Sequence, residues 1–263
     1  MLGAKRRDHI LQSVLVEGAL KVSDLARELN VSDITIRRDI SQLSRQGLVR
    51  KVHGGVINAR HYLSSHEPPF LENRDIQLGA KTAIAQHAAT LVTPGQSVAL
   101  LGGSTIFALA KALLPLGSLS IVTNSVPVSD LFAQHTGHHH SIILTGGSRT
   151  PTDSLVGPVA VDTFRGFNVD IAFMGSFGVD PKKGFSTPNP LEADVNKAVI
   201  AQTHTVCVLA DHTKWGVRGL ATFADFSDVH HLVTDSDVDL TWRKEVKNLV
   251  PLTVVASEET QTT

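Results

Sequence analysis

The stretch Val31-Ser32-Asp33-Ile34-Thr35-Ile36-Arg37-Arg38-Asp39-Ile40 decides the fold of the N-terminal part of this 263-residue chain. Ser32 is a residue type that favours the N-cap of a helix, and Gly47 is one that favours a helix end. We therefore predict a helix over residues 33–46. The short connection Asn30-Val31 precedes it, which is typical of a helix-turn-helix unit.

This predicted helix has two faces of different chemistry. At 100° per residue, Ile36, Ile40 and Leu43 fall within about 60° of one another and are expected to face a core. The opposite face and its flanks carry Thr35, Arg37, Arg38, Ser41 and Arg45. Such a helix suits the DNA major groove. Its arginines can contact guanine edges or phosphates, and the pattern leaves both open.

Two shorter helices are predicted before this helix and a basic wing after it. Apolar residues at helical spacing predict a first helix that ends at Gly18, and Ser23 is the expected N-cap of the second. Residues 48–56 predict a two-stranded wing around a glycine turn. Lys51 and His53 of this wing can reach the DNA backbone or minor groove.

Charge is divided unequally along the chain. The formal net charge is −1, yet residues 1–62 contain 11 Lys and Arg against 6 Asp and Glu, and the remainder contains 13 against 19. Charged helix faces are often merely solvated, but the capped turn, the charge balance and the wing together favour a nucleic-acid-binding module. The predicted DNA-binding residues are Ser32, Thr35, Arg37, Arg38, Ser41, Arg45, Lys51 and His53.

These motifs resemble the DeoR family of bacterial transcriptional regulators. The resemblance rests on Val22-Ser23-Asp24-Leu25-Ala26, on the stretch 31–40 and on His53-Gly54-Gly55. It implies a repressor with a winged helix-turn-helix domain, whose third helix reads operator DNA. We assign residues 1–57 to this domain and call it the head.

The remainder of the chain alternates short apolar runs with helical stretches. Residues 58–73 are polar, contain Pro68-Pro69 and predict a linker, and a helix is expected from Arg74 to about Thr90. The alternation predicts an α/β domain over residues 74–257, here called the body, with a doubly wound and mainly parallel sheet. The expected strands are Ser97–Leu101, Ser120–Val122, Ser141–Leu144, Asp170–Met174, Thr205–Leu209, His231–Val233 and Leu252–Val255.

Glycines and small polar residues follow five of these strands directly. They include Gly102, Gly103, Ser104, Thr105, Thr123, Asn124, Gly146, Gly147, Arg149, Gly175, Ser176, Gly178, Asp211 and Lys214. Ligands of open α/β sheets bind at the carboxyl ends of the strands, and a glycine turn that opens a helix leaves N–H groups free for an anion. One such turn can be purely geometric. Five turns, with Arg149 and Lys214 adding positive charge, predict a pocket for a small phosphorylated or carboxylated ligand.

The body also resembles the C-terminal sensor domain of the DeoR family, so the resemblance covers nearly the whole chain. It rests on Lys81-x-x-Ile84-Ala85, Gly103-Ser104-Thr105, Val122-Thr123-Asn124-Ser125, Gly146-Gly147, Asp170-x-Ala172-Phe173-x-Gly175 and Ala210-Asp211-His212-x-Lys214. It implies a fold similar to ribose-5-phosphate isomerase and an effector that is a phosphorylated sugar or a related metabolite. Leu101-Gly102 departs from the Asp-Ser that family members commonly carry, which bears on sugar-hydroxyl contacts at that turn and not on the phosphate cradle.

The alternative function is a sugar-phosphate isomerase with an added DNA-binding domain. Such an enzyme needs a general base near the substrate carbon and a group that holds the enediolate, and the candidates are Glu192, Asp211 and Lys214. Glu192 lies in a pattern that resembles the helix-opening motif of the regulators, where a carboxylate complements the helix dipole. After Asp170 the chain reads Ile-Ala-Phe-Met, where the isomerases place further acidic residues. We therefore expect a regulator and no catalysis.

Four histidines, His135, His138, His139 and His140, raise a metal hypothesis. Adjacent histidines can bind nickel or zinc, but neither a carboxylate nor a cysteine lies nearby in sequence, which favours a solvated loop. The single cysteine, Cys207, excludes a disulfide framework and a cysteine-based zinc site. We expect neither a metal nor a cofactor.

The expected protein is a cytoplasmic repressor of carbohydrate-metabolism genes. The apolar stretch Val98–Gly117 contains Gly102-Gly103 and predicts a strand, a turn and a buried helix rather than a membrane span. The expected partners are double-stranded operator DNA and a phosphorylated sugar. The family resemblance further implies a homo-oligomer, a dimer or a tetramer, on repeated half-sites.

Overall fold

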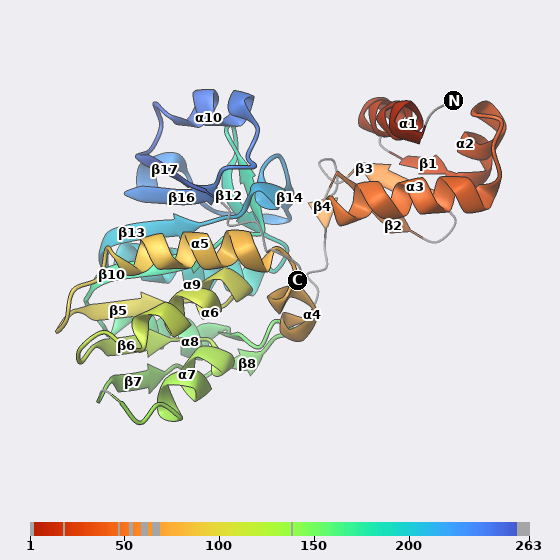
Figure 1. Ribbon diagram of the computed structural model, residues 1–263. Coiled ribbons are helices and arrows are strands. Elements are labelled where there is room, and N and C mark those ends of the chain that lie inside the picture. The colour runs from red at the N-terminus through yellow and green to blue at the C-terminus, as the bar shows by residue number, and fades with distance from the viewer. Residues whose placement is uncertain are drawn as a thin grey trace. The chain divides into compact units, whose positions relative to one another are not determined.

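The computed structural model describes residues 3–17, 19–46, 48–52, 55–58, 63–64, 69–137 and 139–256 (Figure 1). The chain divides into two compact units. One comprises residues 1–63 with 216–218, and the other comprises residues 64–215 with 219–263.

The described part of the head combines three helices with a small antiparallel sheet. Its elements are α1 (Gly3–Glu17), β1 (Ala19–Lys21), α2 (Val22–Glu28), α3 (Asp33–Arg45), β2 (Val49–Val52) and β3 (Gly55–Asn58). The strand order is β1-β3-β2. The predicted helix-turn-helix is confirmed, and the predicted two-stranded wing gains β1 as a third strand. His53, Gly18 and Gly47 lie outside the described residues.

Local interactions explain where α3 begins and how it packs. Ser32 is the N-cap, and its Oγ accepts a hydrogen bond from the Thr35 N–H at 3.3 Å. Asn30 in the preceding turn adopts a left-handed φ of 51°. As predicted, the apolar stripe of α3 is buried, in one cluster with residues of α1, α2 and the sheet that include Ile10, Val14, Leu25, Ile36, Ile40, Leu43 and Val56.

The predicted cap of α2 is wrong. This helix begins at Val22, one residue before Ser23, and follows Lys21 without a side-chain cap. The reason is that β1 runs directly into α2, so that Val22 is buried at the first helical position. Packing of Val22 and Leu25 sets this helix start, and the capping chemistry of Ser23 does not.

A single parallel sheet forms the centre of the body. Its strands are β5 (Ser97–Leu100), β6 (Ser120–Thr123), β7 (Ser141–Leu144), β10 (Val169–Gly175), β13 (Thr203–Leu209), β16 (His231–Asp235) and β17 (Leu252–Val255). The order is β17-β16-β13-β10-β5-β6-β7, and every neighbouring pair is parallel. All the strands predicted for this sheet are therefore confirmed, with ends that differ by at most two residues.

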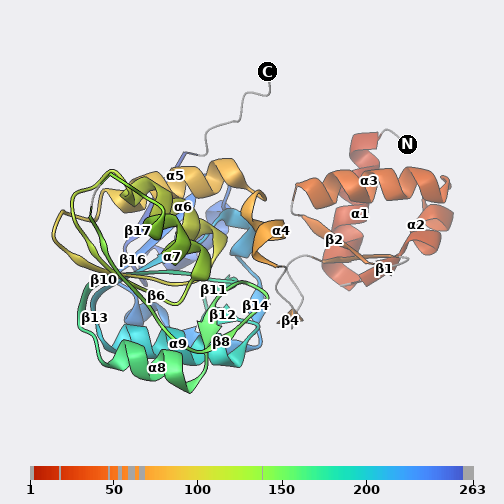
Figure 2. The ribbon, with the colours of Figure 1, turned by 90° about the horizontal axis from the view of Figure 1, so that it is seen from below.

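Helices cover both faces of this sheet (Figures 1 and 2). One face carries α5 (Leu78–Ala89), α6 (Ser104–Leu113) and α7 (Val126–Ala133), and the other carries α8 (Pro158–Arg165) and α9 (Pro190–Ala201). Alternate residues of β5 pack on opposite faces of the sheet. Val98 and Leu100 belong to the hydrophobic cluster under α5, α6 and α7, and Ala99 belongs to the cluster under α8 and α9. The fold is thus the predicted α/β class with a doubly wound sheet.

Shorter elements surround the main sheet. They are β4 (Leu63–Ser64), α4 (Phe70–Arg74), β8 (Ser148–Arg149), β9 (Leu155–Val156), β11 (Gly178–Asp180), β12 (Gly184–Thr187), η1 (His212–Lys214), β14 (Arg218–Gly219), β15 (Ala221–Ala224), η2 (Phe226–Asp228) and α10 (Leu240–Val246). β11, β12 and β15 form an antiparallel sheet, and β12 and β15 pack against α9. The sequence patterns predicted none of the short strands of the body.

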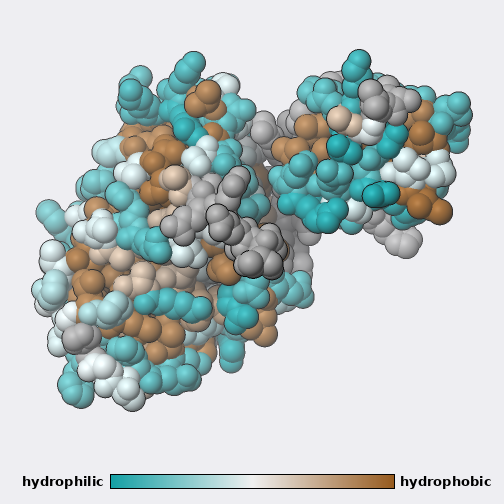
Figure 3. All heavy atoms as spheres, in the orientation of Figure 1, coloured by the Kyte–Doolittle hydropathy of each residue, from teal (hydrophilic) through white to brown (hydrophobic). Residues whose placement is uncertain are grey.

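The helix predicted over residues 74–90 is wrong at its start. α4 begins within the predicted linker, and α5 starts only at Leu78, after Gln77 with a left-handed φ of 55°. In place of a membrane span, the apolar stretch Val98–Gly117 forms β5, a turn and α6. Among the described residues, no helix has the length and apolarity needed to cross a bilayer. Hydrophobic and hydrophilic side chains are interspersed over the body face seen in Figure 3.

Candidate ligand pocket and nucleic-acid interface

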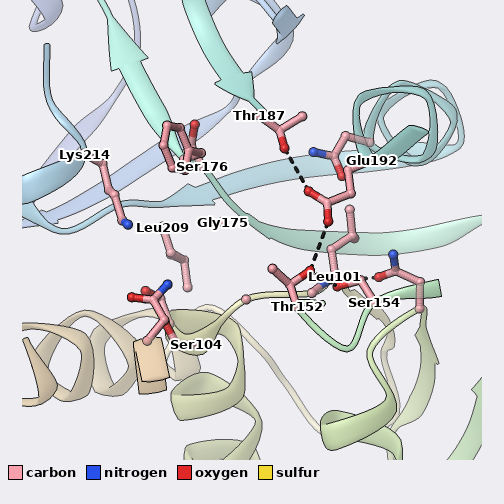
Figure 4. Close-up of a pocket in the computed structure, with 17 residues that line it drawn as sticks. Leu101, Ser104, Thr152, Ser154, Gly175, Ser176, Thr187, Glu192, Leu209 and Lys214 are labelled. Carbon is pink, nitrogen blue, oxygen red and sulfur yellow. Dashed lines mark hydrogen bonds between the residues drawn. The ribbon is translucent and has the colours of Figure 1, made fainter. Parts of the chain in front are cut away.

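A pocket lies at the carboxyl ends of β5 and β10, where the strand order of the sheet reverses (Figure 4). The chain moves outward in one direction from β5 and in the other from β10, so the loops after these two strands diverge and leave a crevice. The lining residues are Asn73, Leu101, Gly102, Gly103, Ser104, Thr105, Asn124, Thr152, Ser154, Gly175, Ser176, Phe177, Thr187, Glu192, Asn196, Leu209 and Lys214.

The turn between β5 and α6 places free backbone N–H groups at the pocket. Gly103 has a φ of 127°, and the ten-residue α6 begins at the next residue without a side-chain cap. The Gly102 N–H donates to Asn124 Oδ1 at 3.1 Å, and a Cβ on Gly102 would collide with Ser154 Oγ. The N–H groups of an uncapped first turn attract an anion.

Lys214 supplies positive charge to the same side of the pocket. It closes η1, the short helix after β13, and Asp211 caps that helix by accepting the Thr213 N–H at 3.0 Å. The Lys214 Nζ lies 5.9 Å from the centre of the Phe177 ring, and the side chain points into the space above Ser104 (Figure 4). The α6 N-terminus and this ammonium group together form a cationic end.

A carboxylate stands at the opposite side. Glu192 lies in the first turn of α9, and its two carboxylate oxygens accept hydrogen bonds from Thr152 Oγ1 at 3.0 Å and Thr187 Oγ1 at 2.8 Å (Figure 4). Burial raises the pKa of Glu192, and the hydrogen bonds from Thr187 and Thr152 oppose this rise. The prediction that Glu192 only complements a helix dipole is therefore too narrow, because the side chain also lines the pocket.

The pocket gathers part of the predicted ligand-binding set. Predicted residues in its lining are Gly102, Gly103, Ser104, Thr105, Asn124, Gly175, Ser176 and Lys214. Predicted residues that do not line it are Thr123, Gly146, Gly147, Arg149, Gly178 and Asp211.

Thr123, Arg149 and Asp211 are engaged elsewhere. Thr123 is buried, and its Oγ1 donates to the Leu100 carbonyl at 2.5 Å. Arg149 is exposed, pairs with Asp153 at 2.9 Å and is not among the residues that line the pocket. Asp211 is buried and serves as the cap of η1. Following a parallel strand therefore does not by itself bring a residue to the crevice.

Several residues that line the pocket were not predicted from the sequence. Thr152 and Ser154 come from the loop between β8 and β9, Thr187 ends β12, and Asn73 lies in α4. These segments are far apart in sequence and follow none of the predicted strands. For Glu192, the sequence offers a helix-opening pattern and a candidate general base of the alternative enzyme, but the residue is not in the predicted ligand-binding set.

The predicted DNA-binding residues differ in whether their side chains are exposed or already hydrogen-bonded within α3. Arg37, Arg38 and Arg45 are exposed, and so is Lys51 on β2. The hydroxyls of Ser32 and Ser41 are used locally, because Ser32 caps α3 and Ser41 Oγ donates to the Arg37 carbonyl at 2.5 Å. Thr35 is half-buried beside Ser32. The side chains free for base or phosphate contacts are therefore mainly the basic ones.

A buried ion pair joins α3 to α1. Asp39 lies on the buried side of α3, and its carboxylate accepts from Arg6 Nε at 2.5 Å, with Arg7 at 3.6 Å. An unpaired buried carboxylate would be costly, so this pair fixes how the two helices pack. A shallow groove beside it is lined by Arg6, Arg7, Ile34, Thr35, Arg38, Asp39 and Gln42.

Of the histidines in the predicted metal cluster, His135 and His140 lie side by side with ring centres 6.1 Å apart, but they belong to no group of three possible ligands among the described residues. His140 Nδ1 accepts the Leu119 N–H at 3.3 Å and its ring packs edge-on against Phe132, so the solvated-loop interpretation is wrong for this residue. His139 is exposed, and His138 lies outside the described residues. Within the described chain, the one group of side chains close enough to share an ion is His212, Asp235 and Asp237.

His212 and Asp235 form a hydrogen-bonded pair behind Lys214. Asp235 accepts both the His212 N–H at 2.6 Å and the ring Nδ1 at 2.7 Å. Burial lowers the pKa of His212, but the hydrogen bond and charge of Asp235 outweigh it, so this pKa stays above its ordinary value. For Asp235, burial raises the pKa, but the hydrogen bonds and charge of His212 lower it by more, so the pKa lies below its ordinary value. The pair anchors η1 and thereby Lys214.

Two family models match the chain. The DeoR-like helix-turn-helix domain matches residues 6–61, and the DeoR C terminal sensor domain matches residues 76–236. The HTH-type transcriptional regulator GlpR of Haloferax volcanii is 30% identical, over 94% of this chain and 96% of that protein. The transcriptional repressor AccR of Agrobacterium fabrum is 31% identical, over 88% of this chain and 89% of that protein.

Among solved structures, ribose 5-phosphate isomerase A from Methanocaldococcus jannaschii is similar to the chain with a TM-score of 0.38. The match has 20% sequence identity and covers 51% of this chain and 53% of that chain.

The pair of His212 and Asp235 predicts a pH-dependent stability. A raised folded-state pKa means that the His212 charge contributes stability below its unfolded value, near pH 6.5, and that this contribution is lost as pH rises through the folded value. His212→Asn keeps an N–H donor near the place of Nδ1 but carries no charge. We expect it to lower Tm by a few degrees at about pH 6 and by less at about pH 9, measured by calorimetry. His139→Asn is the exposed control, and equal losses at both pH values would contradict a charge effect.

Proposed function

Because the chain belongs to the DeoR family of transcriptional regulators, we propose that it represses carbohydrate-metabolism genes and leaves its operator when a phosphorylated sugar binds the pocket. The observation that carries the proposal is the polarity of the pocket, with Lys214 and the α6 N-terminus at one side and Glu192 at the other. The relatives named above are transcriptional regulators and not enzymes.

A phosphorylated sugar matches both sides of this pocket. A phosphate on the N-terminus of α6 would accept the free N–H groups and lie near the Lys214 ammonium group. Sugar hydroxyls would then face Glu192, whose carboxylate already accepts two threonine hydroxyls and has lone pairs for more. Asn73, Thr152 and Asn196 supply further polar groups. Leu101 stands where a sugar-binding carboxylate was expected from the family pattern, so hydroxyl contacts come from Glu192 instead.

α4 offers a route from the pocket to the chain that leads to the head. Its Asn73 lines the pocket, and the Asn73 carbonyl accepts from the buried Lys81 Nζ at 2.6 Å. Phe70 packs edge-on against Phe107 of α6 with ring centres 5.2 Å apart. The residues immediately before α4 connect it to the head. A ligand that moves Asn73 would therefore move the attachment point of that connection.

Operator binding by a symmetric oligomer completes the proposal. A single small head makes few contacts, whereas two heads on repeated half-sites multiply the affinity. The ligand then acts by linkage, because it binds one arrangement of the heads better than the other. We propose a dimer or a tetramer.

Arg38→Ala tests the DNA-binding face. Loss of one base or phosphate contact should weaken binding by about 1–3 kcal/mol, which is about fivefold to 150-fold. The measurement is fluorescence anisotropy on an operator selected from random duplexes with the full-length protein, at several salt concentrations. Arg165→Ala, an exposed arginine of the body, is the control. An unchanged affinity and salt dependence would remove Arg38 from the interface.

Lys214→Ala tests the anion side of the pocket. In a thermal-shift series with pentose and hexose phosphates and the corresponding free sugars, we expect a phosphate to raise the Tm of the wild-type protein. Loss of a charge-assisted hydrogen bond of about 1.5–3 kcal/mol should weaken that ligand at least tenfold in the variant, with DNA affinity retained. Lys183→Ala is the control outside the pocket lining. Equal shifts by free sugars, or an undiminished response of the variant, would contradict the assignment.

Phe70→Ala tests the route through α4. The change removes the edge-on contact with Phe107, so a sugar phosphate should still raise Tm but should release operator DNA poorly. Phe70→Leu retains much of the apolar contact and is expected to restore release. The measurement pairs thermal shift with ligand-induced loss of anisotropy. Normal release by Phe70→Ala would show that the signal leaves the pocket by another path.

A further inference from the structure

One large apolar side chain of the head is exposed on the same face of α3 as the basic residues. Ile34 is the second residue of α3 and has 79% of its surface exposed, more than any other large hydrophobic residue that the structure describes as exposed. It is absent from the hydrophobic cluster of the head. An isolated exposed isoleucine is ordinary, so its position on the helix decides what it means.

Ile34 lies at the centre of the outward face of α3. At 100° per residue, it falls about 20° from Arg45 and about 40° from Arg38, on the side opposite the buried Ile36 and Ile40. Ile34 also lies in the first turn of α3, the end of a recognition helix that contacts base edges in helix-turn-helix proteins. Ile34 therefore lies on the same face of α3 as Arg38 and Arg45 and faces the same ligand as these arginines.

The surroundings of Ile34 fit DNA better than an apolar protein surface. The groove beside it is lined by Arg6, Arg7 and Arg38, with Asp39 as the single acidic residue, and Asp39 is already paired with Arg6. A cationic rim around one apolar side chain complements a polyanion. Within the major groove, the apolar group that base edges present is the C5-methyl of thymine.

We infer that Ile34 contacts a thymine C5-methyl group in the major groove and gives the head a preference for thymine at one position of each half-site. The inference rests on the proposed operator binding and adds a residue that reads the base by apolar contact, where Arg37, Arg38 and Arg45 read by hydrogen bonds or charge. Burial of one methyl group corresponds to about 0.8 kcal/mol, or about fourfold in affinity.

Replacement of thymine by deoxyuridine removes only that methyl group, so it tests the contact directly. The probe is the duplex selected with the full-length protein, with each thymine replaced in turn, and the readout is the dissociation constant. For the wild-type protein we expect about a fourfold loss at one position of each half-site. For Ile34→Ala the loss at that position should vanish, while the remaining positions respond as in the wild type. Leu240→Ala, a residue of α10 that is 65% exposed, is the matched control.

Each other outcome overturns the inference. If the deoxyuridine effect is as large in Ile34→Ala as in the wild type, another residue contacts the methyl group. If no thymine methyl matters although the duplex binds tightly, Ile34 makes no such contact and operator binding still stands. If Ile34→Ala instead changes the oligomeric state seen by light scattering, the residue belongs to a protein interface. Failure to select any duplex would reject operator binding itself.

Discussion

The reversal of strand order between β5 and β10 is the constraint on which the body depends. Parallel strands end at the same edge, so the reversal places the loops after β5 and β10 on the two sides of one crevice. The first of these loops opens α6 at an uncapped N-terminus, and the neighbouring β13 delivers Lys214 through η1. The cationic side of the pocket thus follows from topology, because backbone N–H groups and one ammonium group are brought together without a dedicated cluster of basic residues.

Buried acidic groups hold both parts of the protein in place, and each has a partner. Asp39 joins α3 to α1 through Arg6, Asp235 holds η1 through His212, and Glu192 ties α9 to two threonine-bearing segments. A buried carboxylate without a partner would be strongly destabilising, so each pairing restricts how its elements pack. Two of the three pairings position the pocket. In the body, Asp235 is engaged with His212, while Glu192 keeps its place in the pocket lining opposite Lys214.

The head separates its core from its binding face by helical period alone. Ile36, Ile40 and Leu43 are buried on one side of α3, and Arg38, Arg45 and Ile34 stand on the other. The exposed isoleucine breaks the simple rule of apolar inside and polar outside, and such a break on a recognition helix is more informative than another arginine. Charge explains attraction to any DNA, whereas an apolar contact distinguishes thymine from the other bases.

The sequence by itself determined the helix-turn-helix, the inward and outward faces of α3 and every strand of the parallel sheet, because these features follow from local capping, from the helical period of 3.6 residues and from short apolar runs between helical stretches. Only the tertiary structure decided which residues line the pocket. Arg149 and Asp211 follow strands as expected yet are engaged in their own loops, while Asn73, Thr152 and Glu192 arrive from segments with no strand-end signal. The physical reason is that a binding site is set by distances in space between residues far apart in the chain, and residue periodicity carries no information on those distances.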